Sequence, residues 1–275
     1  MNTKIKVGIF DVILYLIVFI VVQLIVTIAG AGIWAAANDM AFVSAFQALG
    51  LGENAALLAL TTVFSSVISF IIFVKAKWTP IARNYLASKP WFSLMWVALF
   101  TLGLIIPLQF IFEKMGVEMD PQYQHLFEGL MKEPWGYVAI GIMAPLVEEV
   151  VFRGAILRTL LDMMGKKWYW VAILISAAMF GTVHGNMAQF LNAMLLGMVL
   201  GWMYYRTKSI VPGILMHWVN NSVAYILANV VPNSNAQLIE LFGGNEQTMY
   251  FAVGFSLCIA IPSLFQMVVR LKPAH

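Results

Sequence analysis

The fold class follows from the stretch VILYLIVFIVVQLIVTIAGAGI at residues 12–33, which holds 22 residues in a row without a charge. A helix rises about 1.5 Å per residue, so about 20 apolar residues cross the roughly 30 Å hydrocarbon core of a bilayer. Working outward from this stretch, the sequence predicts eight such segments. They are residues 8–33, 54–74, 92–112, 136–158, 169–185, 187–205, 210–231 and 248–269.

These segments predict an all-α membrane protein, a polytopic bundle of about eight transmembrane helices. A spanning segment must satisfy its own backbone hydrogen bonds, and none of the eight alternates like a barrel strand. Hydrophobic residues make up 61% of the chain and charged residues 11%, against roughly 45–50% and about 25% in soluble domains. This composition excludes a soluble enzyme, a nucleic-acid binder and a disordered chain. The only cysteine, Cys258, excludes a disulfide framework.

The basic residues predict the topology. Of the 16 Lys and Arg residues, only Lys114 and Lys132 fall in segments that would lie outside, so 14 lie on the predicted cytoplasmic side. Both termini are then cytoplasmic. We predict a single integral membrane domain over residues 1–275, with a motif-bearing catalytic core at about 136–225. Short loops without retention signals favour a bacterial inner (plasma) membrane.

Charged side chains inside the predicted segment 136–158 are the first functional signal. Each costs roughly 2.5–3.5 kcal/mol on insertion scales, so it indicates a function by default. Glu149 and Arg153 are four residues apart, which places them on one helix face and predicts an ion pair. Glu148 is rotated about 100° from Glu149 and is left free to act as a general base. Pro145 removes a backbone hydrogen bond and is expected to kink the helix just before the two glutamates.

Two of the four histidines lie in later predicted segments. His184 follows Phe180 by four residues, and Asn221 follows His217 by four. A single histidine in a membrane segment usually makes a hydrogen bond between packed helices. Two of them beside a pair of glutamates favour hydrolysis instead, in which a base activates water while imidazole and amide donors hold the oxyanion.

Three motifs carry a family resemblance. They are E-E-x-x-x-R at 148–153, F-x-x-x-H at 180–184 and H-x-x-x-N at 217–221. In this order, on separate predicted membrane segments, they resemble those of the CAAX protease and bacteriocin-processing (CPBP) family. This family consists of intramembrane endopeptidases and includes the type 2 CAAX prenyl protease.

The resemblance implies a role for each motif residue. Glu148 would activate the attacking water, and His184 would position it or take part in proton transfer. His217 and Asn221 would stabilise the oxyanion. The residues that would support the site are Glu149 and Arg153.

The family has been described both as metal-dependent and as glutamate-type. The sequence has no H-E-x-x-H, so no paired-histidine zinc motif is present. We therefore expect no metal and no other cofactor. Zinc is the alternative, with Glu148, His184 and His217 as ligands and an open fourth position.

The leading hypothesis is an intramembrane endopeptidase that cleaves a membrane-associated substrate, either a prenylated CAAX-like protein or a leader peptide. The alternatives are a non-proteolytic bacteriocin-immunity or sorting protein on the same scaffold, and a proton-coupled transporter. The expected partners are membrane lipid and a peptide or lipidated protein substrate. No G-x-x-x-x-G-K-[ST] motif is present, which argues against a nucleotide. The composition already argues against a nucleic acid.

Overall fold

A computed structural model describes residues 3–80, 84–231 and 237–273, and within these ranges all regular secondary structure is helical. The predicted all-α fold class is thereby confirmed. The first half of the chain forms α1 (Thr3–Ala37), α2 (Phe42–Gly50), α3 (Ala55–Lys75), α4 (Asn84–Ala87), α5 (Trp91–Lys114) and α6 (Pro121–Lys132).

The second half contains a continuous helical run whose hydrogen-bond pattern alternates. Its parts are the π-helical η1 (Tyr137–Met143), α7 (Ala144–Glu148), the π-helical η2 (Glu149–Leu157) and α8 (Arg158–Met164). The remaining elements are the 3₁₀ turn η3 (Lys166–Trp168), α9 (Tyr169–Thr182), α10 (Met187–Thr207), α11 (Val211–Val230), α12 (Leu238–Leu241) and α13 (Glu246–Arg270).

Five helices in the described part of the chain are long and apolar enough to cross a membrane, namely α1 from Gly8, α3, α5, α10 and α13. The count of eight crossings therefore stays a prediction. The predicted segment 169–185 is shorter in the structure, because α9 has 14 residues and rises about 21 Å. It ends there because Gly185 adopts a φ of 77°, and the Asn186 side chain then caps α10 by accepting from the Gln189 N–H.

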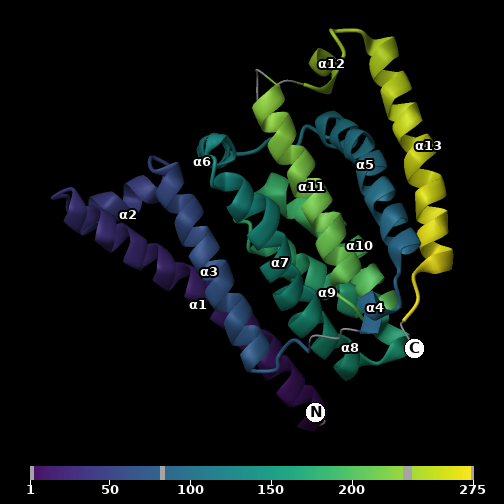
Figure 1. Cartoon of the computed structure of the whole chain (residues 1–275), viewed down its shortest axis with the longest axis horizontal. Helices are drawn as coiled ribbons and strands as arrows, with labels where there is room; N and C mark the ends of the chain where they lie inside the picture. The colour runs from purple at the N-terminus through teal and green to yellow at the C-terminus, as the bar shows by residue number, and fades with distance from the viewer. Residues whose placement is uncertain (1–2, 81–83, 232–236, 274–275) are drawn as a thin grey trace.

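The helices form two flanks around a central group (Figure 1). Helices α1, α2 and α3 lie on one flank, and α5 with α13 lies on the other. The end of α13 and the beginning of α1 lie at the same lower end of the view. Between the flanks, η2 is buried along its whole length, so the motif-bearing helix forms the centre of the protein.

Candidate active site

The ion pair predicted between Glu149 and Arg153 is present at the centre of the molecule. Arg153 Nη1 donates to Glu149 Oε1 at 2.7 Å, and both side chains are fully buried. Arg153 Nη2 also donates to the Gly197 carbonyl on α10 at 3.3 Å. A Cβ at Gly197 would lie 3.1 Å from Arg153 Nη2, so the glycine lets α10 approach the guanidinium. The pair therefore joins η2 to α10.

Glu148 faces a different direction from Glu149, as the helix geometry predicted. Its Oε2 lies 3.5 Å from His217 Nε2, and its side chain is 17% exposed whereas that of Glu149 is 0% exposed. His217 Nδ1 lies 3.6 Å from Glu149 Oε1. The imidazole therefore stands between two carboxylates, one held by Arg153 and one accessible.

Phe180 brings the histidine of the second motif to this cluster. The Arg153 guanidinium carbon lies 4.4 Å from the Phe180 ring centroid, a cation–π contact inside the protein. The His184 and His217 rings contact the same ring edge-on, with centroid distances of 5.0 and 5.7 Å. His184 Nδ1 also lies 2.9 Å from the Phe180 carbonyl, which orients its imidazole. The spacing of the motif placed Phe180 and His184 on one face, but gave no sign that this ring is where Arg153 and both histidines meet.

Asn221 lies one helical turn beyond His217 on α11 and bonds the helical run that carries the two glutamates. Its Nδ2 donates to the Ile140 carbonyl at 3.0 Å. In the π pattern of η1, the Ala144 N–H bonds to the Ala139 carbonyl, so the Ile140 carbonyl would next require an N–H from residue 145. Pro145 has none, which leaves this carbonyl free for the asparagine. The bond uses one of the two amide hydrogens of Asn221.

Side chains from outside this helical run also bond the carbonyls of η2. Thr79 Oγ1 donates to the Val150 carbonyl at 2.6 Å, and Ser176 Oγ donates to the Phe152 carbonyl at 3.0 Å. A Cβ at Gly154 would lie 2.2 Å from Thr79 Cγ2, so only glycine admits this contact. π-Helical turns occur frequently at functional sites, and here they flank the glutamate pair.

Three buried polar atoms in the cluster have no hydrogen-bond partner in the part of the chain that the structure describes. They are Glu149 Oε2, Arg153 Nε and His217 Nδ1. Most buried polar atoms in proteins are paired, so three unpaired polar atoms in one cluster indicate a functional site.

The alternative zinc set does not fit this arrangement. Within residues 3–80, 84–231 and 237–273, no three His, Cys, Asp or Glu side chains gather in a way that would hold a metal ion. Glu148 and His217 are adjacent, and Nδ1 of His184 faces a backbone carbonyl, an orientation that is also usual in metal-bound histidines.

The site lies within the part of the chain that matches a known family. Residues 131–223 match the type II CAAX prenyl endopeptidase Rce1-like family. The match includes all six predicted site residues, and it confirms the resemblance drawn from the three motifs.

A curated relative points the same way. The chain is 26% identical over 163 residues to a protein of Bacillus subtilis (strain 168) named "Putative membrane peptidase YdiL". This alignment covers 55% of the chain and 65% of the relative, which is less than two thirds of that protein. No solved structure matches the chain.

Proposed function

We propose that this protein is an intramembrane endopeptidase that hydrolyses a peptide bond with a water activated by Glu148. The observation that carries the proposal is the position of Glu148. It is the accessible carboxylate of the cluster and lies 3.5 Å from His217, while the adjacent Glu149 is neutralised by Arg153. The family match and the membrane peptidase relative support hydrolysis of a membrane-associated substrate.

The residues divide the reaction between them. Glu148 takes a proton from water, and the resulting hydroxide attacks the carbonyl carbon of the scissile bond. His217 and the remaining amide hydrogen of Asn221 donate to the oxyanion of the tetrahedral intermediate. Glu148 then returns the proton to the leaving amine as the C–N bond breaks. His184, oriented by Phe180, positions the water.

Glu149 and Arg153 support this chemistry without contacting substrate. Glu149 Oε1 accepts from Arg153 and lies 3.6 Å from His217 Nδ1, and we propose that its charge favours the imidazole orientation with Nε2 toward Glu148. The buried guanidinium of Arg153 carries the charge that offsets that of Glu149.

The substrates we propose are a prenylated CAAX-like protein or a leader peptide, presented in a bacterial inner membrane. Both are anchored at the membrane surface, so the segment to be cleaved can reach a carboxylate that lies inside the helical bundle. We expect neither a nucleotide nor a nucleic acid among the partners of this protein.

The test is peptide cleavage by purified protein in proteoliposomes. A panel of prenylated and plain peptides is incubated with the wild type, Glu148→Gln and Glu246→Gln, and products are identified by mass spectrometry. Glu246 is an exposed acid at the start of α13, so its variant controls for loss of a carboxylate as such. We expect Glu148→Gln to lose about 10²–10⁴-fold in rate with its fold intact, and the control to retain activity.

Two results would contradict the proposal. Equal cleavage by Glu148→Gln and wild type would remove Glu148 from the mechanism. Loss of cleavage with a chelator, reversed by zinc, would show a metal-dependent reaction. If neither protein cleaves any peptide while both remain folded, a non-proteolytic immunity or sorting function becomes the better explanation.

A further inference from the structure

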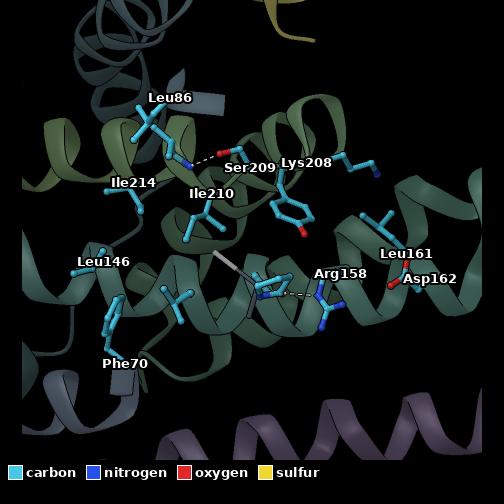
Figure 2. Close-up of a pocket in the computed structure, with 15 residues that line it drawn as sticks. Phe70, Leu86, Leu146, Arg158, Leu161, Asp162, Lys208, Ser209, Ile210 and Ile214 are labelled. Carbon is cyan, nitrogen blue, oxygen red and sulfur yellow. Dashed lines mark hydrogen bonds between the residues drawn. The ribbon is translucent and has the colours of Figure 1, made fainter. Parts of the chain in front are cut away.

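A cavity lies on the other side of the α7–η2–α8 run from Glu148. It has a volume of about 470 Å³ and is enclosed by α3, α4, the α7–α8 run, the end of α10 and the beginning of α11 (Figure 2). Leu146 and Val150 line it, whereas Glu148, between them in sequence, does not. This volume falls within the roughly 300–1,000 Å³ typical of small-molecule sites. The cavity is therefore large enough for a ligand and separate from the proposed reaction.

The cavity has one apolar end and one charged end (Figure 2). Phe70 and Ile214 lie at the apolar end, and Arg158, Asp162 and Lys208 lie at the other. Asp162 and Lys208 are exposed, so the charged end opens to the surface. Two cations against one carboxylate leave a net charge of +1 at this mouth. This distribution matches a ligand with an apolar chain and an anionic head.

The Arg158 side chain is fixed in place before any ligand binds. Its Nε donates to the Gly154 carbonyl at 3.0 Å, and its Nη2 donates to the Trp78 carbonyl at 2.8 Å. The Lys208 residue has a left-handed φ of 56° at the end of α10, and its Nζ lies 4.7 Å from the Tyr205 ring centroid. The mouth thus presents one cation held by two backbone carbonyls and one cation that lies over an aromatic ring.

The predicted topology determines which ligands meet this mouth. Arg158 and Lys208 belong to the basic side of the protein, which the positive-inside rule assigns to the cytoplasm. Anionic phospholipids of the cytoplasmic leaflet attract basic groups at this depth, and basic pockets between membrane helices bind their head groups.

We propose that this cavity binds one anionic phospholipid of the inner leaflet, with an acyl chain along the apolar wall and the phosphate at Arg158 and Lys208. An acyl chain that moves from the bilayer into the cavity leaves one apolar environment for another, so it gains little free energy. The preference between lipids must therefore come from the head group. One cation near the surface is worth about fivefold in affinity for an acidic lipid.

The test measures lipid retention by native mass spectrometry of the whole protein in mild detergent. Phosphatidylglycerol and phosphatidylcholine with the same acyl chains are titrated against the wild type. We expect one phosphatidylglycerol to bind at least fivefold more tightly than phosphatidylcholine. Lys208→Gln should abolish most of this preference, and Lys208→Arg should keep it. Lys272→Gln, on the same predicted side but outside the cavity, should bind as the wild type does.

A second pair of variants tests the chain position. Ile214→Trp fills the apolar end, whereas Ile259→Trp adds the same volume on the exposed face of α13. We expect only the first to lose the bound lipid. Equal retention of both lipids by the wild type, an unchanged preference in Lys208→Gln, or equal loss in both tryptophan variants would overturn the proposal, as would displacement of the lipid by inorganic phosphate alone. These readouts require no proteolysis, so they stand or fall independently of the proposed activity.

Discussion

Gly213, in the first turn of α11, makes room for the buried carboxylate of the site. A Cβ at this position would lie 2.3 Å from Glu149 Oε2 and 3.1 Å from Glu149 Cδ. The end of a flexible side chain usually moves away from such a contact at little cost. Here Glu149 is fully buried and its other oxygen is held by Arg153 at 2.7 Å, so the carboxylate has nowhere to go without lengthening the ion pair. Gly213→Ala therefore perturbs the site through a single methyl group.

The expected change in the free energy of unfolding follows from two destabilising contributions and one stabilising contribution. Overpacking a buried position costs about 1–3 kcal/mol, and complete loss of a buried ion-pair partner costs about 3–5 kcal/mol. Alanine regains about 1 kcal/mol over glycine in a helix. Because the carboxylate must shift by about an ångström while keeping its charge partner, we expect Gly213→Ala to lower the free energy of unfolding by about 2 kcal/mol. We also expect the rate of peptide cleavage to fall, since the Glu149 carboxylate beside His217 would move.

The assay measures unfolding in mixed micelles by titration with temperature or with a denaturing detergent. Gly254→Ala is the matched control. Gly254 is also helical, and a Cβ there meets nothing within 4 Å, so its variant should be neutral or slightly more stable. If the two alanine variants unfold within about 0.5 kcal/mol of each other, the claim that Glu149 is rigidly held is wrong.

Three further predictions concern other contacts. Thr79→Val removes the bond to the Val150 carbonyl at nearly constant volume and should cost about 1 kcal/mol, measured by the same unfolding titration. Phe180→Leu removes the cation–π contact with Arg153 and should cost about 2 kcal/mol or more, whereas a leucine at a lipid-facing phenylalanine should cost little. Burial raises the pKa of Tyr85 to about 12, so its stabilising contribution is complete below pH 10 and is lost as the pH rises from 10 toward 12. Subtracting the absorbance titration of Tyr85→Phe from that of the wild type isolates the ionisation of this tyrosine from that of the other tyrosines. A difference spectrum that develops near pH 10 would contradict the prediction.

Helical periodicity was sufficient to predict much of the geometry of the central cluster. The four-residue spacing of Glu149 and Arg153 and the separate direction of Glu148 follow from α-helical geometry, and both hold in the structure. The path of α9 was less predictable, because its end depends on the left-handed turn at Gly185 and not on hydropathy. The sequence also could not show which side chain meets His217, since contacts between helices depend on packing and not on spacing.

Hydropathy and spacing do not reveal the π-helical turns, but the bond that joins the first of them to α11 can be traced to individual residues. Pro145 was predicted to remove one backbone hydrogen bond and to kink the helix. In the structure it removes one N–H, and the carbonyl so released accepts from Asn221 of α11. The same helix carries His217 one turn earlier, so the bond that compensates the proline also sets how closely His217 approaches Glu148. The position of Pro145 and the asparagine of the H-x-x-x-N motif are therefore linked by one hydrogen bond. A proline elsewhere in the run would leave its carbonyl without this partner, and the glutamate without its histidine.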